Sequence, residues 1–452
     1  MILTILAYAM IIVFMVIIMK KKMSPFTALV AIPTVFALIA IGFSQLGLID
    51  PIKGNIGDFV LDGIATTSTT GIMLLFAILY FSIMLDAGLF DPVTKKMIQF
   101  AKGDPMKILI ATAVVAATVS MNGDGTTTTL ICCTAFLPIY KKLNMNIMNF
   151  GVLVIMQNTI MNLLPWGGPT ARAMSVLDVG AEILGYLLPG MIISVLFVIF
   201  IVAPSMGRKE RARLGITNFT DEELEKLTSI SDEETLKLRC PKNFIFNAIL
   251  TILLIVLLVL DSFLSLGLPP LLLFLLGTVI ALLVNYPNLA DQGKRISENA
   301  GDAVSVVILV FAAGVFMGLF QETGMAEALA VSFTKIIPNQ LAGFWGMVIA
   351  IISAPGTFFI SNDGFYYGVL PVLAEAGRSY GFTNMQLALA SLMGQAFHNI
   401  SPLVAFIYLL LRLTGLDLGE WQKSAAKWLV IVFIIFVVTI IIIGGVPLYI
   451  SQ

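Results

Sequence analysis

The sequence predicts an all-α membrane protein that crosses the bilayer many times, and three observations lead to this fold class. Of its 452 residues, 58% are hydrophobic and only 12% are charged, whereas about a quarter of the residues in soluble domains are charged. The mean hydropathy is +0.98. The apolar residues form long continuous runs rather than the alternating pattern of a transmembrane β-barrel. This composition excludes a water-soluble enzyme, a nucleic-acid-binding protein and a disordered chain.

Ten segments of the chain are predicted to cross the membrane. A crossing helix needs about 20 mostly apolar residues, because the hydrocarbon core is about 30 Å thick. The first segment is a retained span rather than a signal peptide, because its lysines follow the apolar run instead of preceding it. The predicted spans are 2–19, 26–43, 63–86, 147–164 continuing to 177, 183–203, 243–262, 268–285, 301–320, 384–412 and 428–448.

The positions of the basic residues predict how the chain is oriented, since lysine and arginine remain on the cytoplasmic side. When the lysine cluster at 20–22 is placed inside, most of the 26 basic residues fall in cytoplasmic loops, including the loop 208–242. The opposite orientation would put most of them outside. The favoured orientation places both termini outside the cell and leaves one cation, Arg172, within the membrane.

Two further apolar segments, 107–140 and 341–376, are interrupted by glycine-rich polar sequence. The first interruption reads Asn-Gly-Asp-Gly-Thr from Asn122, and the second reads Ser-Asn-Asp-Gly from Ser361. Lysines flank both ends of the first segment, so both ends belong on the cytoplasmic side. We therefore expect two re-entrant hairpins, one opening inward and the other outward.

The two halves of the chain resemble each other. An Asp-Gly pair marks the tip of each hairpin, and the run 162–165 (Asn-Leu-Leu-Pro) resembles 399–402 (Asn-Ile-Ser-Pro). Each half has five crossings, so the second half enters the membrane from the opposite side. This predicts two inverted repeats, 1–207 and 243–452, each with five transmembrane helices and one re-entrant hairpin. Secondary transporters are often built in this way.

The segment 208–242 is the hydrophilic linker between the predicted repeats. Capping-box patterns begin at Thr220 and Ser231, and they predict two short helices. A solvated tether on the cytoplasmic face is the favoured interpretation, and a regulatory role is the alternative.

The hairpin tips carry the first group of candidate functional residues. Polar backbone at membrane depth is tolerated only where protein or a water-filled cavity satisfies it. Glycines at 123, 125 and 364 allow the chain to turn, and Asp124 and Asp363 place one carboxylate at each tip. A charge at mid-bilayer costs about 2.5–3.5 kcal/mol, so we favour proton or cation coupling over simple helix capping. Neutral hydrogen-bonding groups surround these carboxylates: Asn122, Thr126, Thr127, Ser361 and Asn362.

Two breaks inside apolar spans carry the second group. The run 165–172 contains two prolines and two glycines, which cannot continue a regular helix. Arg172 in this run is either a carboxylate clamp or the structural partner of an acidic residue such as Asp178. His398, the single histidine, lies in the second break at 395–402. It could exchange a proton near neutral pH, although a lone histidine on a helix is more often a packed hydrogen-bonding residue.

Motifs for catalysis and ATP hydrolysis are absent from the sequence. It has no P-loop, zinc-ligand cluster or nucleophile elbow. A membrane-embedded hydrolase would need a paired nucleophile and base. A passive pore would need a continuous polar stripe, whereas polarity is concentrated here at the two tips and the two breaks. The sequence therefore favours a secondary transporter over an enzyme or a channel.

The residues at these positions resemble one known family, the bacterial citrate–divalent metal–proton symporters of the ion transporter superfamily, which also includes dicarboxylate–sodium symporters. The similarity rests on 122–128 (Asn-Gly-Asp-Gly-Thr-Thr-Thr), on 160–173 with its Pro-Trp-Gly-Gly-Pro-Thr core, and on His398 with 401–403 (Ser-Pro-Leu). It also includes 285–289 and 311–316, so it covers nearly the whole chain. It implies a homodimer in the bacterial plasma membrane, surrounded by lipid, with elevator motion of a transport domain against a scaffold.

The resemblance also implies a substrate, namely citrate complexed with a divalent metal ion such as magnesium or calcium, carried with protons. The metal is then a co-substrate near Asp124 and Asp363 rather than a permanently bound cofactor. Proton or cation coupling falls to Asp124, Asp363 and His398. The substrate-binding residues are Asn122, Gly123, Gly125, Thr126, Thr127, Gly168, Thr170, Arg172, Ser361, Asn362, Gly364 and Ser401. The alternative is a sodium-coupled transporter of free di- or tricarboxylates.

Overall fold

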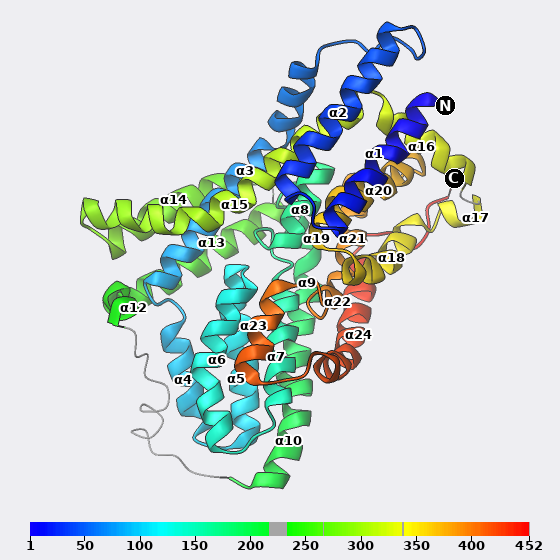
Figure 1. The fold of residues 1–452 in the computed structure, drawn as a ribbon. Coiled ribbons are helices and arrows are strands. Elements are labelled where there is room, and N and C mark those ends of the chain that lie inside the picture. The colour runs from blue at the N-terminus through cyan, green and yellow to red at the C-terminus, as the bar shows by residue number, and fades with distance from the viewer. Residues whose placement is uncertain (217–232, 265, 337–338, 452) are drawn as a thin grey trace.

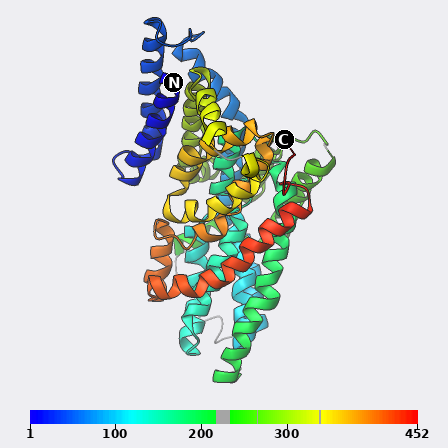
Figure 2. The same cartoon turned by 90° about the vertical axis from the view of Figure 1, so that its right-hand side faces the viewer.

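A computed structural model describes residues 1–216, 233–264, 266–336 and 339–451. Every regular element in these ranges is helical. Both chain ends lie in the upper half of the two views, whereas α10 ends at the bottom (Figures 1 and 2). Within the described residues, seven helices are long and apolar enough to cross a membrane, and shorter apolar helices accompany them. The chain is therefore an all-helical, multi-pass membrane protein.

The first half of the chain contains the elements up to α10. Its helical hairpin is formed by α5 and α6, and its broken span by α7 and α8. The bounds are α1 Ile2–Met19, α2 Pro25–Gln45, α3 Ile56–Asp86, α4 Asp91–Ala101, α5 Pro105–Val119, η1 Ser120–Asn122, α6 Gly125–Lys142, α7 Ile147–Met161, α8 Gly168–Leu177, α9 Ile183–Phe197, η2 Val198–Val202 and α10 Ala203–Leu214.

The second half follows a comparable order, with a hairpin formed by α18 and α20 and a broken span formed by α21 to α23. The bounds are α12 Glu233–Leu238, η3 Pro241–Asn243, α13 Phe244–Leu264, α14 Pro270–Asn285, α15 Leu289–Glu322, α16 Met325–Ile336, α17 Asn339–Ala342, α18 Trp345–Phe359, α19 Asn362–Gly364, η4 Phe365–Val369, α20 Leu370–Ser379, α21 Asn384–Leu392, α22 Gln395–His398, α23 Ala405–Thr414 and α24 Leu418–Ile442.

Short polar signals set the ends of these apolar helices. Ser24 caps α2 and Asp104 caps α5, and in both helices proline occupies the first turn, where its missing N–H costs nothing. Thr383 and Gln386 form a reciprocal capping box at the start of α21. The helices thus begin where the apolar runs meet a capping residue.

The long helices α3 and α15 pack against each other, and glycines bring their backbones into contact where they cross. A Cβ atom at Gly63 would lie 2.1 Å from the carbonyl oxygen of Gly314, and one at Gly318 would lie 2.2 Å from that of Phe59. Only glycine allows this approach, as in close helix crossings within membranes. The neighbouring helices α2 and α14 pack on α15 and α3, respectively.

The two hairpins lie in different parts of the molecule. Helices α5 and α6 occupy the lower part of Figure 1, and α18 and α20 lie in the upper part. The hairpin predicted at 107–140 falls on α5, η1 and α6, and the one predicted at 341–376 falls on α17 to α20. The tips of both hairpins therefore face the middle of the molecule, where the broken spans interrupt their helices.

The ends of the predicted linker are attached to the helical body. Arg211 at the end of α10 forms an ion pair with Asp104, its Nε lying 2.9 Å from the carboxylate. Burial raises the pKa of Asp104, but hydrogen bonds from Arg211 and the Met106 amide outweigh this and hold the pKa below its ordinary value. Arg239 donates to the backbone at the end of α3 and pairs with Asp91. The helix predicted after Ser231 corresponds to α12. The one predicted after Thr220 lies outside the described residues.

The α3–α15 crossing can be tested by adding one methyl group. Gly314→Ala would place its Cβ 2.4 Å from the Gly63 carbonyl oxygen. The helices must then separate, at a cost of about 1–3 kcal/mol. We expect a lower midpoint of thermal unfolding in detergent. Gly293→Ala in the same helix is the control, because its Cβ would meet no atom within 4 Å, and it should leave the midpoint unchanged or raise it. Equal midpoints for the two variants would contradict the crossing.

Candidate functional site

The first hairpin tip is a tight turn held by its own side chains. Gly123 has a φ of +81°, in the left-handed region that favours glycine. Asn122 Oδ1 accepts a hydrogen bond from the Asp124 amide at 2.7 Å. The Asp124 carboxylate accepts from the amides of Thr126 at 3.2 Å and Thr127 at 2.6 Å, so it caps α6 with both oxygens. The Asp124 side chain is also exposed, so capping and contact with a ligand are compatible.

The second tip is tied to the second broken span. Ser361 caps α19 by accepting from the Gly364 amide at 3.2 Å. Asn362 Oδ1 accepts a hydrogen bond from Gln395 Nε2 at 2.9 Å. The same amide group donates to the hydroxyl of the buried Tyr366 at 3.0 Å. The position of this tip is therefore set by Gln395 from α22.

The first break packs directly against the first tip. Trp166 Nε1 donates to the carbonyl oxygen of Met121 at 2.7 Å. The chain bends sharply here, because a Cβ atom at Gly167 would lie 2.0 Å from the carbonyl oxygen of Asn162. Thr170 is buried, and its hydroxyl donates to the Leu163 carbonyl at 2.9 Å. The prolines and glycines thus create an irregular turn whose polar groups are satisfied internally.

An ion pair joins this break to the opposite tip. Arg172 Nε donates to Asp363 Oδ1 at 2.7 Å, and each side chain is 20% exposed. A second guanidinium nitrogen donates to the Gly168 carbonyl oxygen at 2.8 Å. The sequence pointed to Asp178 as a possible structural partner of Arg172, and this choice of residue was wrong, because the partner is Asp363. Asp178 follows α8 in a left-handed conformation and lines a cavity, whereas Arg172 reaches across to the second half of the chain.

Two candidate residues from the sequence, His398 and Ser401, connect the second break to α18 by hydrogen bonds. His398 is 7% exposed, and its Nδ1 lies 2.7 Å from the Thr357 carbonyl oxygen. The Ser401 hydroxyl donates to the Phe358 carbonyl oxygen at 2.6 Å. Both acceptors lie at the end of α18, just before the second tip. In this conformation His398 has the contacts of a packed hydrogen-bonding residue, which was one of the two readings of the sequence.

A buried amide network joins the two halves, and it was not among the candidates from the sequence. Asn399 Nδ2 donates to Asn158 Oδ1 at 3.2 Å, and Asn158 Nδ2 lies 3.4 Å from the Ser120 hydroxyl oxygen. All three side chains are buried. Gln157 and Thr159 are buried beside Asn158 on α7, and within the described residues their side chains have no hydrogen-bond partner. The sequence feature that could have indicated this network is the run of three polar residues, 157–159, inside an otherwise apolar span.

A polar cavity of about 530 Å³ is lined by residues of α3, α15 and α16 and by residues of α8, α20 and α21. Ser175 reaches it, and the Ser175 hydroxyl donates to the Arg172 carbonyl oxygen at 2.9 Å. One basic residue lines the cavity, Arg378, whereas its acidic lining consists of Asp62, Asp178, Glu322, Glu327 and Glu375. Asp62 lies on α3 and Glu322 ends α15, so their convergence on one cavity depends on the crossing of these two helices.

The structure thus brings some of the predicted residues together and leaves others apart. Arg172 meets Asp363, and Asn362 meets Gln395. Within the described part of the chain, no contact is recorded between Asp124 and Asp363 or between Asp124 and His398. In the same ranges, no group of three or more His, Cys, Asp or Glu side chains is placed to hold a metal ion. The centre is therefore a set of linked tips and breaks beside an acidic cavity.

Comparison with known proteins decides the family. The sequence model described as "Citrate transporter" matches residues 14–394. The chain belongs to the citrate transporter family. The family resemblance expected from the tips and breaks is confirmed, and the family and its curated relatives are transporters rather than enzymes.

Two curated relatives from Bacillus subtilis (strain 168) align over almost their whole length. A citrate transporter is 43% identical over 443 residues, covering 98% of this chain and 99% of the relative. A Mg(2+)/citrate complex secondary transporter is 39% identical over 450 residues, covering 99% of each. Among solved structures, the Alcanivorax borkumensis YdaH transporter, described as having an unusual topology, matches with a TM-score of 0.55 at 13% identity. It covers 94% of this chain and 99% of its own, and this likeness shows the fold alone.

The buried amide pair can be tested with a double-mutant cycle. Asn158→Leu and Asn399→Leu each leave one buried amide unpaired, at a cost of about 1–3 kcal/mol. The double variant removes both groups, so it should cost less than the sum of the single changes. Unfolding free energies measured by denaturant titration in detergent give the coupling. Strictly additive costs would show that the pair makes no energetically significant contact.

Proposed function

We propose that this chain is a secondary active transporter that carries citrate, complexed with a divalent metal ion, together with protons. Membership of the citrate transporter family supports the carboxylate substrate. The relative named a Mg(2+)/citrate complex secondary transporter supports the metal complex. The observation that carries the proposal is electrostatic: Arg172, the cation assigned to the membrane interior, is already paired with Asp363.

The charge of the substrate must match this environment. Free citrate is a trianion at neutral pH, whereas its complex with a divalent cation has a single negative charge. Moving a multiply charged anion out of water is expensive unless charges in the site compensate it. One guanidinium shared with a carboxylate suits the monoanionic complex much better than it suits the trianion.

The acidic lining of the cavity also favours the metal–citrate complex over free citrate. Its five carboxylates and one arginine would repel a free trianion more strongly than a monoanionic complex. The cavity reaches the end of α8, so a substrate passing through it would arrive close to Arg172. The charge distribution along the chain places this end of α8 on the extracellular side, which makes the cavity the external entrance.

Coupling follows from competition for Arg172. A substrate carboxylate that accepts hydrogen bonds from the guanidinium would displace Asp363. The released carboxylate can then accept a proton or contact the metal ion. Asp124, exposed at the other tip, is the second coupling residue. His398 contributes when the break moves away from the Thr357 carbonyl. In this scheme Asp363 is the counterion of Arg172 before the substrate binds, and substrate binding frees the Asp363 carboxylate to accept a proton.

The groups that hold the substrate come from both tips and both breaks. Backbone and side-chain groups contribute from Asn122, Gly123, Gly125, Thr126, Thr127, Gly168, Thr170, Ser361, Asn362, Gly364 and Ser401. The hydroxyls of Thr170 and Ser401 donate to backbone carbonyls in this conformation. These two residues therefore offer only acceptor oxygens until the breaks rearrange.

The architecture that we propose for transport is a pair of inverted repeats working as an elevator. Each half runs from a long crossing helix, α3 or α15, through a hairpin to a broken span, and this shared order supports the repeats. The hairpins and broken spans form the transport unit, which moves against α2, α3, α14 and α15. We further propose a homodimer in the bacterial plasma membrane with the linker 208–242 in the cytoplasm.

Uptake of radiolabelled citrate into proteoliposomes tests the substrate and the coupling ion. Citrate should accumulate only with a divalent cation and a proton gradient, and without sodium. A panel of magnesium, calcium, zinc and iron then ranks the metals. Metal-free uptake driven by sodium would instead establish the alternative, a sodium-coupled transporter of free carboxylates.

The role of Asp124 can be separated from helix capping. Asn is as good an N-cap as Asp, so Asp124→Asn should fold normally while losing proton-coupled uptake. Asp417→Asn is the matched control, because Asp417 caps α24 through a similar bond to the Glu420 amide at 3.0 Å. We expect full uptake from the control. Normal uptake by Asp124→Asn would remove Asp124 from the coupling mechanism.

The structural and functional roles of the Arg172–Asp363 pair can also be separated by mutation. Asp363→Asn leaves Arg172 partly buried without its counterion, so both thermal stability and uptake should fall. Adding Arg172→Gln removes the unpaired charge and should restore stability but not uptake. If the double variant transports citrate at the native rate, the ion pair is only structural.

A further inference from the structure

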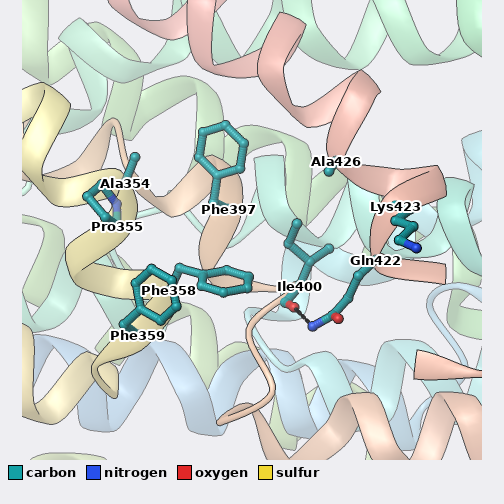
Figure 3. A pocket seen from close by; sticks show the side chains of 9 residues that line it. All are labelled: Ala354, Pro355, Phe358, Phe359, Phe397, Ile400, Gln422, Lys423 and Ala426. Carbon is teal, nitrogen blue, oxygen red and sulfur yellow. Dashed lines mark hydrogen bonds between the residues drawn. The ribbon is translucent and has the colours of Figure 1, made fainter. Parts of the chain in front are cut away.

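An apolar groove with a volume of about 420 Å³ runs along the outside of the second hairpin (Figure 3). We call it the α18–α24 groove. One wall is the end of α18, the floor is the second break, and the other wall is the first half of α24. The groove is lined by Ala354, Pro355, Phe358, Phe359, Phe397, Ile400, Gln422, Lys423 and Ala426. It is separate from the acidic cavity, with which it shares no lining residue.

The groove is apolar along its length and positively charged at one end. The rings of Phe358 and Phe359 stand edge to face at 4.9 Å, and the Phe359 side chain is 69% exposed. Figure 3 shows the Lys423 ammonium beyond Gln422, away from the phenylalanines. Lys423 is exposed, and among the described residues it has no recorded ion-pair partner. The nearest acidic residue on its own helix is Glu420, one turn earlier and also exposed.

The position of the groove connects it to the transport machinery. Gln422 Nε2 donates to the Ile400 carbonyl oxygen at 2.7 Å, which ties α24 to the second break (Figure 3). Phe358 accepts the Ser401 hydroxyl bond, and the preceding residue, Thr357, accepts the contact from His398. A molecule in the groove would therefore press on the outer face of the segments that hold the second tip.

We propose that the α18–α24 groove is a binding site for an anionic phospholipid, whose acyl chain lies along the phenylalanines and whose headgroup pairs with Lys423. The chain is a multi-pass membrane protein, so an outward-facing apolar groove is filled by lipid tails rather than water. Lys423 lies in the second turn of α24, near the end that the charge distribution places at the cytoplasmic surface. There a basic side chain attracts anionic headgroups, with a gain of about fivefold in affinity per charge.

The bound lipid would act as a wedge between α18 of the second hairpin and α24. Because the acyl chain packs against Phe358 and Phe397, it resists any movement that closes α18 onto α24. Displacement of the second tip during transport must either carry the lipid along or expel it. The groove thus makes the mobility of the second hairpin depend on the charge of the surrounding membrane.

Native mass spectrometry of the purified full-length chain in detergent tests the site. Phosphatidylglycerol should bind more tightly than phosphatidylcholine. Lys423→Gln should reduce this preference about fivefold while leaving phosphatidylcholine binding unchanged. Ala426→Trp, which fills the groove, should weaken the binding of both lipids. Soluble glycerol 3-phosphate should not compete, because the acyl chain supplies most of the contact.

Lys427→Gln is the matched control. Lys427 lies one turn further along α24, is exposed, and places its ammonium over the ring of Trp428 rather than in the groove. It should retain the native preference for phosphatidylglycerol. If Lys423→Gln and Lys427→Gln lose the preference for phosphatidylglycerol equally, general surface charge explains the preference, and the proposed site is overturned. Conversion of a dimer to a monomer by Ala426→Trp would overturn it as well, because a second copy of the chain would then be the occupant.

Discussion

Irregular backbone at the depth of a bilayer finds no water to bind, so each of its polar groups needs a partner within the protein. This constraint organises the centre of the molecule. Trp166 holds the first tip, Gln395 holds the second, and Arg172 bridges the first break to the second tip. The Asn158–Asn399 contact joins the halves again beside the first tip. No tip or break can move relative to the others without losing at least one of these contacts.

In the proposed mechanism, the same contacts allow a site with little net charge to bind a charged substrate. Arg172 is not an unpaired cation, since Asp363 already neutralises its charge. In the mechanism that we propose, a carboxylate-bearing substrate would replace one ion pair by another instead of adding a charge to the interior. This exchange would keep the desolvation cost low and would release the Asp363 carboxylate to accept a proton. The acidic cavity next to Ser175 would apply the same selection before the substrate reaches Arg172.

The fold separates two kinds of surface around the transport elements. Towards α3 and α15, the broken span α7–α8 borders a polar cavity rich in carboxylates. On the outer side, the second hairpin and α24 border an apolar groove that ends at Lys423. Glycines at the α3–α15 crossing lock the central helices together, whereas the hairpin tips are held by individual hydrogen bonds. The α3–α15 pair and the hairpin tips thus differ in the kind of contact that holds them.

The sequence by itself determined the all-helical membrane fold class, the positions of both tips and breaks, and the family. These features depend on local properties: apolar length, glycine and proline content, and capping residues. It also singled out Arg172 and Asp363, because charges inside apolar runs are costly. Only the tertiary structure decided that these two residues pair with each other rather than Arg172 with Asp178, and that Asn158 meets Asn399. The same is true of the convergence of Asp62 and Glu322 on one cavity. Such contacts join residues far apart in the chain, and helix crossing, not local composition, determines them.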